Sequence, residues 1–437
     1  MRPYPIFLMI QHDTVVIGAG LAGLSFAYHY DKNLPVYESN DIVGGLVRTI
    51  DYKGCKFDLA PHLLHLRNPY VRELVFDKLG LEVETHKRKA HIYYDKVIIP
   101  YPFELNLLNL SEKTKRECLE GLNEVKHLTR EEELETRKGS YRDYALKCFG
   151  SGIANHYLLP YNRKIWDTDP ADMTCEFMSH LITVDKDKIK QNAFEENTDS
   201  FGYNVDFYYP VKKGIQDLAD IFAQQLGNIK LNTTAKFFNT RNKTIEMSDG
   251  TVVKYNRLAS TVPLQSIIRN SDRDDLKPLA DELVYTSVYT VNIVIKGKVP
   301  DTHWMYFPDK ELSFYRISYP KNYFKKATPN DEQIIAVEVG SRNHSLSIDQ
   351  IEQKVVEEIK RMPIFQIDEI VFVHSIKIPV AYCIYEPKRP PIVEQLITTL
   401  EKDGIYQIGR YGRWEYSSMQ DAIMDGKLLA DKFRTND

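Results

Sequence analysis

The sequence predicts an α/β fold with more than one domain, and three observations lead to this class. Residues 14–17 form a short β-branched run typical of a buried strand, and a glycine-rich turn and a helical segment follow it directly. Strand, glycine-containing turn and helix patterns return near the end of the chain, at residues 404–433. The chain has 437 residues, which exceeds what one hydrophobic core usually organises. We therefore expect a discontinuous Rossmann-type domain assembled from both chain ends, with other domains inserted.

The composition excludes several classes of function. The net charge is -4 with both signs mixed along the chain, and no basic tail or low-complexity run is present, so nucleic acid is not an expected partner. No apolar run reaches the length of a membrane span, and the apolar stretch before Met9 is too short for a signal peptide. The five cysteines are scattered, without metal-ligand or redox spacing. We expect a cytoplasmic protein without a metal site; the sequence leaves open a start at Met1 or Met9 and is compatible with a homo-oligomer.

The first turn predicts a dinucleotide site. Gly18 permits the tight turn, Gly20 lets a pyrophosphate approach the backbone, and Gly23 lets helix and strand pack closely. The next strand pattern ends at Glu38, whose carboxylate is expected to accept hydrogen bonds from a ribose. A 2′-phosphate on the adenosine would face this carboxylate, and the two negative charges would repel each other. A 2′-phosphorylated dinucleotide is therefore disfavoured, and the candidate cofactors are NAD and FAD. The predicted contacts in this part are Gly18, Ala19, Gly20, Leu21, Ala22, Gly23, Glu38 and Ser39.

A second glycine pair, Gly44-Gly45, follows only a few residues after Glu38. The segment ESNDIVGGL is similar to a flavoprotein pattern in which such a pair extends the cofactor site beyond the adenosine. NAD-dependent dehydrogenases do not usually carry this pair. The resemblance therefore implies FAD, with Gly44, Gly45 and Leu46 beside its pyrophosphate and ribityl chain.

The remaining chain shows three further kinds of pattern. Hairpins are indicated on either side of a helical candidate, at residues 44–62 and 89–103. A charge-rich helical region follows at about 111–190, and then short strands with a turn at Asp249-Gly250. Strands dominate from residue 285 to 379. The predicted domains are an FAD-binding domain of residues 1–80, 205–265 and 398–437, a helical domain of residues 104–204, and an antiparallel sheet domain of residues 81–103 and 266–397.

The chain resembles the UDP-galactopyranose mutase family in four motifs that occur in the family's order, most closely its longer, eukaryote-like branch. They are PYNRKIW (160–166), WMYFPDKELSFYRIS (304–318), AYCIYEP (381–387) and GRYGRWEY (409–416), and PYPF (100–103) is a further match. The resemblance implies a nucleotide-diphosphate sugar as substrate, a role in polysaccharide biosynthesis and an FAD that is active when reduced. Its N5 attacks the anomeric carbon and displaces the nucleotide diphosphate, and the sugar recloses with a different ring size. NAD(P)H is one candidate reductant.

The same resemblance implies roles for individual residues. Arg316 matches the arginine that binds the diphosphate, and the backbone of His62 matches the position beside flavin N5. The implied substrate contacts are Tyr101, Glu104, Asn162, Trp166, Asn204, Tyr306, Tyr382 and Tyr416. The implied cofactor contacts near the C-terminal end are Gly409, Arg410, Met419 and Gln420, the last two opening a helix whose amides can face the flavin.

Three departures from the family pattern stand out, and the last two bear on the substrate. Ala60-Pro61 replaces a glycine pair and stiffens a loop that the family relies on to flip with the redox state of the flavin. Leu181 lies near the position of a second diphosphate arginine, so one cation is either lost or supplied from elsewhere. Glu104 replaces a glutamine that would meet uracil, and a carboxylate only accepts hydrogen bonds. The candidates for the missing cation are Arg163, Lys164, Lys186 and Lys188.

Two alternatives to a mutase remain at this level. An FAD-dependent oxidase or desaturase of the amine-oxidase or protoporphyrinogen-oxidase type shares the segments GAGLAGL and GGL but needs no tyrosines for a diphosphate. A flavin-binding scaffold without turnover is suggested only by the departures at Ala60-Pro61 and Leu181. The motifs around Arg316 and Trp166 favour the mutase.

Overall fold

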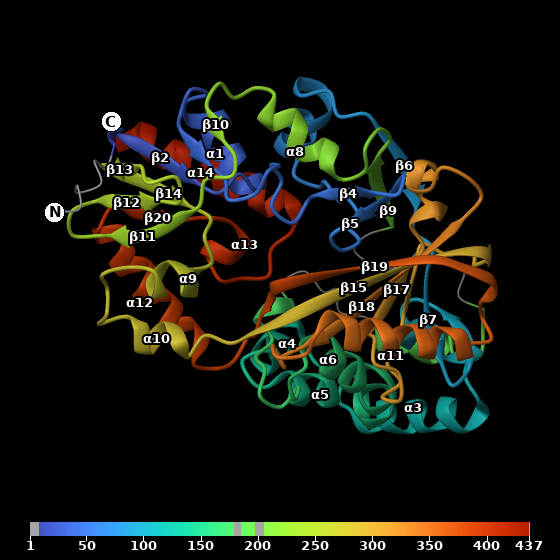
Figure 1. Ribbon diagram of the computed structural model, residues 1–437. Coiled ribbons are helices and arrows are strands. Elements are labelled where there is room, and N and C mark those ends of the chain that lie inside the picture. Colours follow the sequence, from blue (N-terminus) through green and yellow to red (C-terminus); the bar gives the residue numbers. More distant parts are fainter. Residues whose placement is uncertain (1–7, 179–184, 197–204, 437) are drawn as a thin grey trace.

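The computed structural model describes residues 8–178, 185–196 and 205–436. Figure 1 shows the N- and C-terminal ends of the chain on the same side, within one group of strands and helices. The middle of the chain forms a long sheet with helices beneath it. The α/β class with a discontinuous nucleotide-binding part is therefore present.

The nucleotide-binding part is built on a five-stranded parallel sheet. The strand order is β10-β3-β2-β14-β20, and every neighbouring pair is parallel. The central strand β2 is buried along its whole length, as expected for a parallel sheet with helices on both faces. The strands are β2 (Thr14–Ile17), β3 (Val36–Tyr37), β10 (Ile229–Lys230), β14 (Arg257–Ser260) and β20 (Ile405–Gln407).

Helices cover both faces of this sheet. One core cluster contains side chains of α1 (Leu21–Tyr30), α8 (Gln216–Ala223) and α14 (Met419–Asn436). A second cluster contains side chains of α9 (Leu264–Arg269), α10 (Lys277–Asp281) and α12 (Arg389–Lys402). The prediction had placed α10 and most of α9 and α12 in the sheet domain of residues 266–397. Their apolar faces pack on the nucleotide-binding part instead, and the three-domain division otherwise stays a proposal.

Smaller sheets extend this part. A four-stranded sheet in the order β1-β13-β12-β11 contributes to the second cluster, and its predicted turn at Asp249-Gly250 is present, with Gly250 at φ +83°. The predicted hairpin of residues 44–62 is present as β4 and β5. The elements are β1 (Met9–Gln11), β4 (Thr49–Tyr52), β5 (Cys55–Asp58), α2 (Pro69–Arg72), η1 (Glu73–Lys78), β11 (Ala235–Asn239), β12 (Thr244–Met247) and β13 (Val252–Lys254).

The strand β6 (Val83–Lys87) pairs with β9 (Asp206–Pro210) in an antiparallel two-stranded sheet. The prediction placed residues 81–103 in the domain of the large antiparallel sheet, and the structure shows that β6 forms a small separate sheet with β9. Phe207 on β9 is fully buried, stacks on the His86 ring at 5.1 Å, and shares a core cluster with Trp304 of the large sheet.

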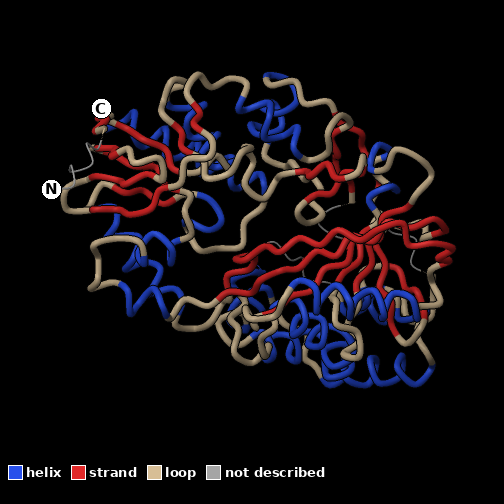
Figure 2. The backbone as a smooth tube through the Cα atoms, viewed as in Figure 1, coloured by secondary structure: helices blue, strands red, loops and turns tan. Residues whose placement is uncertain are grey.

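The large sheet has seven strands in the order β19-β15-β18-β17-β16-β7-β8. Its pairs are antiparallel except for β16 and β7, which run parallel, so the predicted antiparallel sheet is mixed. Figure 2 shows its long strands crossing the molecule above a layer of helices, one of which is α11 (Ile348–Arg361). The strands are β7 (Ala90–Tyr94), β8 (Val97–Pro100), β15 (Tyr285–Lys298), β16 (Trp304–Tyr306), β17 (Arg316–Ser318), β18 (Gln333–Ser341) and β19 (Gln366–Cys383).

The helical part packs against the edge of this sheet. Its core cluster joins the helices to Ile92 of β7 and Ile99 of β8. No helix in the described ranges is long and apolar enough to cross a membrane. The helices are η2 (Phe103–Leu105), η3 (Leu107–Asn109), α3 (Glu112–Glu124), α4 (Arg130–Thr136), α5 (Tyr141–Ile153), η4 (Ala154–Leu158), α6 (Leu159–Trp166), η5 (Glu176–Met178) and α7 (Lys186–Gln191), with η6 (Pro320–Asn322), η7 (Lys325–Ala327) and α13 (Gly409–Gly412) elsewhere.

Candidate functional site

The two glycine motifs of the N-terminal part lie against each other. The turn after β2 brings Gly20 into a bridge with Gly44, and the Gly44 amide donates to Ala19 O at 2.8 Å. A Cβ added to Gly45 would lie 3.2 Å from Gly20 Cα. The structure thus brings together the predicted glycines of residues 18–23 and 44–45 in one backbone cradle. The cradle opens at the N-terminus of α1, where no side chain caps the helix amides.

The Glu38 carboxylate stands beside this cradle, one residue after β3. It is buried, and its Oε2 accepts a hydrogen bond from the Ala19 amide at 2.8 Å. Its Oε1 accepts from Ser39 Oγ at 3.1 Å and from the Asn40 amide at 2.9 Å. The carboxylate is therefore held in a fixed orientation at the carboxyl end of the parallel sheet, where such folds bind nucleotides.

The segment of residues 407–417 provides a test of whether a cofactor fits. Buried polar atoms of four of its side chains have no hydrogen-bond partner among the described residues: Gln407, Tyr411, Trp414 and Ser417. Such atoms are rare in folded proteins, so their clustering indicates a polar group that the protein binds. Gly409 of the same segment lies against Ala22, because a Cβ added to Gly409 would be 2.8 Å from Ala22 Cβ. The segment and the glycine cradle therefore fit one elongated polar cofactor.

Arg410 and Gln420, two of the expected cofactor contacts, make hydrogen bonds within the protein. The Arg410 guanidinium donates to Ala381 O at 3.0 Å and to Ser417 O at 3.0 Å, both carbonyl groups, and it lies between the cradle and the tyrosines. Gln420 Oε1 accepts from the backbone amides of Arg67 and Asn68 at 2.7 and 2.6 Å. The Gln420 side chain thus ties α14 to α2, while Met419 packs into the core below.

His62 lies in a loop that joins the cofactor cradle to the large sheet. Its Nδ1 is 2.6 Å from Ala60 O, and Thr290 Oγ1 of β15 donates to Leu59 O at 2.8 Å. Burial, together with the smaller effect of the nearby charges of Arg410 and Arg316, lowers the pKa of His62 to about 4. The imidazole is therefore neutral at physiological pH, which agrees with a role for the His62 backbone and requires no titration.

Acid is expected to destabilise the protein through His62. Its pKa is about 4 in the fold and about 6.5 in the unfolded chain, so the unfolded chain binds more protons between these values. The resulting loss of stability is absent above about pH 6.5 and grows as the pH falls, reaching about 2 to 3 kcal/mol at pH 4. Urea unfolding from pH 4.5 to 7.5 measures it. The free energy of unfolding of a His62→Gln variant should depend less steeply on pH than that of the wild type. The control His127→Gln, at an exposed site, should keep the wild-type slope. Equal slopes for all three proteins contradict the assignment to His62.

Arg316 forms a bidentate ion pair with Glu338. The two residues face each other on β17 and β18, and Arg316 Nε and Nη2 both donate to the carboxylate, Nη2 at 2.9 Å. Glu338 is only 1% exposed and also accepts from Tyr315 Oη at 3.1 Å. The carboxylate thus orients the planar guanidinium and leaves part of it, 23% exposed, for an anionic ligand.

Aromatic side chains surround this arginine. The rings of Tyr101 and Tyr306 are 5.3 Å apart, and Tyr306 lies 5.3 Å from Tyr161. On the other side, Trp166 lies 5.2 Å from Tyr382.

The second half of this wall meets the cofactor segment. The Tyr416 ring is 6.0 Å from Tyr382 and is 47% exposed, and the Arg410 guanidinium lies 4.6 Å from the Tyr416 ring and 5.4 Å from Tyr382. The charge of Arg316 acts on both Tyr306 and Tyr382, whose pKa values burial raises. Five predicted residues, Arg316, Trp166, Tyr306, Tyr382 and Tyr416, therefore form one wall.

Sequence reasoning missed three residues of this wall. Tyr161 stands beside Asn162 in the same motif, and the helix α6 directs Tyr161 towards Tyr306. Glu338 is an isolated acidic residue in an apolar strand, which was a usable signal of a buried ion pair. The Arg88 guanidinium lies 5.1 Å from the Tyr101 ring, and its charge also acts on Tyr306. Arg88 follows β6, and no local pattern marked it.

Asn162 does not point its amide into the wall. Its Nδ2 donates to Tyr141 Oη at 2.8 Å and to Leu158 O at 2.9 Å, and its Oδ1 accepts from Trp166 Nε1 at 3.1 Å. Both amide hydrogens are used within the helical part, so Asn162 orients Trp166 and Tyr141. The expected contact at Asn204 and the departure at Leu181 lie outside the described residues.

The candidates for the missing cation have partners of their own. Arg163 pairs with Asp169 at 2.8 Å. Lys164 Nζ donates to Phe307 O at 2.8 Å and Asp309 O at 2.7 Å, and burial lowers its pKa to about 7. Lys186 Nζ donates to the carbonyl oxygens of Val125 and Lys126. Besides Arg316, two cations lie beside the tyrosines: Arg88, 5.1 Å from the Tyr101 ring, and Arg410, 4.6 Å from the Tyr416 ring.

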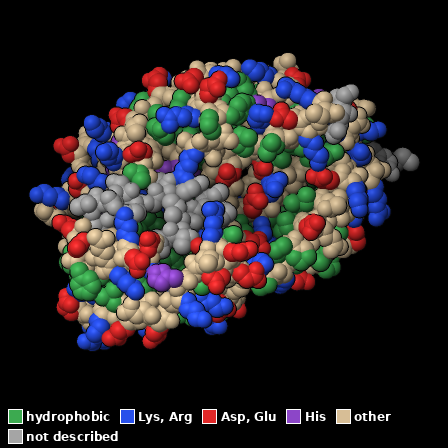
Figure 3. All heavy atoms as spheres, turned by 180° about the vertical axis from the view of Figure 1, so that it is seen from behind, with side chains coloured by type: hydrophobic (Ala, Val, Ile, Leu, Met, Phe, Trp, Pro, Cys, Tyr) green, Lys and Arg blue, Asp and Glu red, His purple; other side chains and the backbone are tan. Residues whose placement is uncertain are grey.

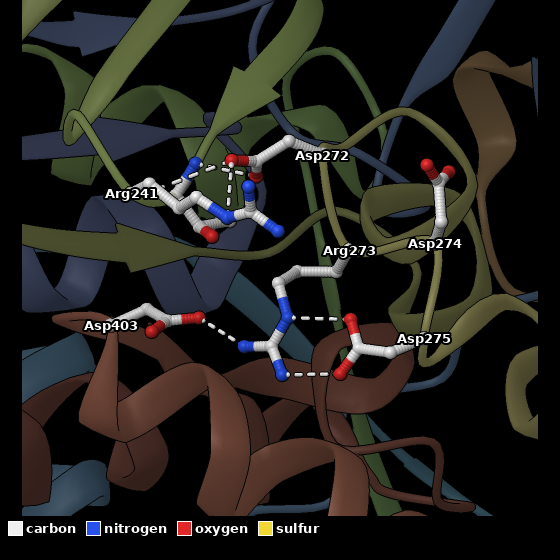
Figure 4. A pocket seen from close by; sticks show the side chains of 7 residues that line it. Arg241, Asp272, Arg273, Asp274, Asp275 and Asp403 are labelled. Atoms are coloured by element: carbon white, nitrogen blue, oxygen red, sulfur yellow. Dashed lines mark hydrogen bonds and ion pairs between the residues drawn. The ribbon is translucent and has the colours of Figure 1, made fainter.

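A separate pocket is lined by charged residues of the nucleotide-binding part (Figure 4). Arg273 donates to both carboxylate oxygens of Asp275 and to Asp403 at 2.5 Å, and the Asp272 carboxylate accepts from the Thr240 amide at 2.8 Å. These contacts tie the loop between α9 and α10 to the end of β11 and to the C-terminal end of α12. Within the described ranges no group of side chains could hold a metal ion, and Figure 3 shows acidic and basic side chains mixed over the rear face.

Known proteins resemble this chain in sequence and fold. A family model described as flavin containing amine oxidoreductase matches residues 21–432. A crystal structure of reduced UDP-galactopyranose mutase superposes with a TM-score of 0.90 and 26% identity, covering 97% of this chain and 96% of that one. A putative protoporphyrinogen oxidase from Exiguobacterium sp. 255-15 has a TM-score of 0.75 at 14% identity, covering 98% of this chain and 100% of that one, which shows the shared fold alone.

Curated relatives match over shorter stretches. A 1-hydroxycarotenoid 3,4-desaturase of Flavobacterium sp. (strain P99-3) is 33% identical over 85 residues, which is 18% of this chain and 17% of that protein. A 4,4'-diaponeurosporene oxygenase of Staphylococcus aureus (strain USA300) is 29% identical over 161 residues, 34% of this chain and 31% of that protein. The matches thus span a third or less of these relatives.

Proposed function

Because the chain belongs to the family of flavin-containing amine oxidoreductases, we propose that it binds FAD and interconverts the pyranose and furanose forms of a nucleotide-linked hexose. The observation that supports this most is the wall of Arg316, Tyr306, Tyr382 and Tyr416 beside the cofactor cradle. A diphosphate needs a fixed cation and hydroxyl donors, and an amine or a carotenoid needs neither. The full-length likeness to a UDP-galactopyranose mutase points in the same direction.

The cofactor would be held by the glycine cradle, by Glu38 and by the segment around Gly409. When bound and reduced, FAD would supply a nucleophilic N5 for the anomeric carbon. Arg316 would bind the diphosphate with the part of its guanidinium that Glu338 leaves accessible. The tyrosine hydroxyls would donate to phosphate oxygens and stabilise the charge that develops as the diphosphate leaves.

Trp166 and the tyrosines would also exclude water from the site. The Trp166 side chain is only 3% exposed, and Asn162 holds its indole in place. A site without water would strengthen the attraction between Arg316 and the phosphates, and it would protect the anomeric carbon from attack by water when the diphosphate leaves. The reaction rearranges one substrate, so it leaves no net change in oxidation state.

A single assay separates the proposal from its alternative. The purified protein is reduced anaerobically and given UDP-, dTDP- and GDP-linked pyranoses and furanoses, and ring interconversion is followed by chromatography. Interconversion without net redox change is the expected result. Oxygen consumption with an amine, a porphyrinogen or a carotenoid would instead support the FAD-dependent oxidase or desaturase, which the partial matches to carotenoid enzymes favour. A colourless protein without FAD contradicts both.

A further inference from the structure

The wall around Arg316 is built from two separate elements of the chain. The helix α6 carries Tyr161 and Trp166, and the hairpin of β16 and β17 carries Tyr306 and Arg316. The Tyr161 and Tyr306 rings meet edge to face, with their centroids 5.3 Å apart. A ligand that contacts both elements is bound well only if α6 and the hairpin keep a fixed position relative to each other.

A lysine side chain joins these two elements by polar contacts. Lys164 lies in the last turn of α6, and its Nζ donates to Phe307 O at 2.8 Å and to Asp309 O at 2.7 Å. Both carbonyl groups belong to the loop that joins β16 to β17. Phe307 directly follows Tyr306, so Lys164 holds the backbone immediately next to a residue of the wall.

The same loop is held at its other end by a second charged side chain. Glu358 of α11 accepts at Oε2 from the Ser313 amide at 3.0 Å and from Ser313 Oγ at 2.7 Å. The charges of Glu358 and Asp309 also favour the ammonium form of Lys164. Hydrogen bonds to charged groups are stronger than those between neutral groups. The loop of residues 307–313 is therefore anchored at both ends.

Burial of the Lys164 ammonium has a cost that these contacts do not fully offset. Within the described part of the chain, the hydrogen-bond partners of its Nζ are both carbonyl oxygens, which carry no full negative charge. Burial accordingly lowers the pKa of Lys164 to about 7. Groups in such a costly state gather at functional sites. Lys164 is thus a candidate for a role beyond the stability of the fold.

We propose that Lys164 is a positioning residue for the wall: it holds the loop between β16 and β17 against α6 and so sets the gap between Trp166 and Arg316 in which the diphosphate binds. The inference rests on the proposed function in taking the ligand to be a nucleotide sugar. Lys164 does not contact the ligand in this role. The sequence suggested Lys164 as a phosphate cation, but its ammonium group is directed to the carbonyl groups of the loop instead.

Limited digestion of the FAD-loaded protein with trypsin measures whether the loop is held. Lys310 and Glu311 are exposed in the loop, so trypsin can cleave between them when the loop opens. In Lys164→Met both hydrogen bonds to the loop are lost, and cleavage after Lys310 should be at least about tenfold faster than in the wild type. Cleavage after Lys53, in the exposed turn between β4 and β5, is the internal reference and should keep its rate.

Calorimetric titration with UDP-glucose, a probe that carries the diphosphate, measures the effect on the wall. Lys164→Met should bind about tenfold more weakly or worse, because the two elements are no longer held in one arrangement. Its flavin absorbance and unfolding temperature should stay close to those of the wild type. Lys164→Arg keeps the charge and several donors, so it should restore both slow cleavage and affinity. The control Arg163→Met removes the neighbouring charge, which pairs with Asp169, and should behave as the wild type in both measurements.

The failures of this inference can be told apart. Unchanged cleavage after Lys310 in Lys164→Met shows that Lys164 does not hold the loop. Equal acceleration after Lys310 and Lys53 indicates a general loss of stability, and selective acceleration with wild-type affinity shows that the loop does not position the wall; each overturns the inference. A wild-type protein that does not bind nucleotide sugars sinks the proposed function, whereas selective cleavage after Lys310 would still assign the loop to Lys164.

Discussion

An Arg316→Ala variant is expected to lose nucleotide-sugar affinity by about a hundredfold or more and to unfold more easily. The guanidinium makes two hydrogen bonds to Glu338, which is 1% exposed. Removing one partner leaves the other charge buried and uncompensated, which typically costs about 3 to 5 kcal/mol of stability. The loss of affinity has a separate cause, because the phosphates lose their bidentate donor.

Two further variants separate stability from binding. In the double variant Arg316→Met with Glu338→Gln both charges are removed, so the free energy of unfolding should return to within about 1 to 2 kcal/mol of the wild type. Binding should not recover, because the phosphate ligand is still missing. The measurements are urea unfolding and calorimetry with UDP-glucose on the same preparations. Recovery of binding in the double variant would show that Arg316 acts only through Glu338 and does not contact the diphosphate.

Glu338→Gln alone examines how the arginine is positioned. A glutamine at this site can still accept one hydrogen bond from Arg316 but cannot hold the guanidinium in two-point contact. We expect affinity to fall less than in Arg316→Ala, with stability reduced by the loss of the buried charge pair.

Much of the fold was predictable because turn chemistry is local. The predicted hairpin of residues 89–103 formed, with its turn at Asp95-Lys96, and so did the one at Asp249-Gly250. The backbone at Asp95, Lys96 and Gly250 has positive φ, as tight hairpin turns require. The strand Thr14–Ile17 was also identified from its β-branched run. In each case a few consecutive residues carry the whole signal.

The pairings between distant segments were not predictable. β6 joins β9 from more than a hundred residues further along the chain, and α12 shares a core cluster with the nucleotide-binding sheet. Both arrangements follow from where apolar faces find partners in three dimensions. Hydrophobic patterns show that a face will be buried, but they do not show against which element.

The same limit applies within the site. The motif PYNRKIW was correctly identified, but consecutive residues on a helix point about 100° apart, so a motif does not tell which side chain faces the ligand. Tyr161 enters the wall, and Asn162 supports Trp166 from behind. The Glu338 partner of Arg316 lies on the neighbouring strand, and only the strand register brings the two together.

The two glycines of the first turn are expected to fail in different ways when replaced by alanine. A Cβ on Gly23 would lie 2.0 Å from Gly18 O, a backbone atom that cannot move without opening the turn. A Cβ on Gly20 would meet nothing closer than Gly45 Cα at 3.8 Å, because the space beside Gly20 is open in the protein itself. Gly23→Ala should therefore destabilise the fold, by about 3 kcal/mol or more, whether or not FAD is bound.

Gly20→Ala should leave the protein without FAD as stable as the wild type but abolish flavin binding. The reason is that the pyrophosphate would need the space that the new methyl group fills. Urea unfolding of the FAD-free protein and flavin fluorescence on titration with FAD measure the two effects. A Gly20→Ala variant that binds FAD normally would place the pyrophosphate away from this turn. A Gly20→Ala variant that unfolds as easily as Gly23→Ala would mean that protein atoms already fill the space beside Gly20. The main argument for the cradle as the cofactor site would then fail.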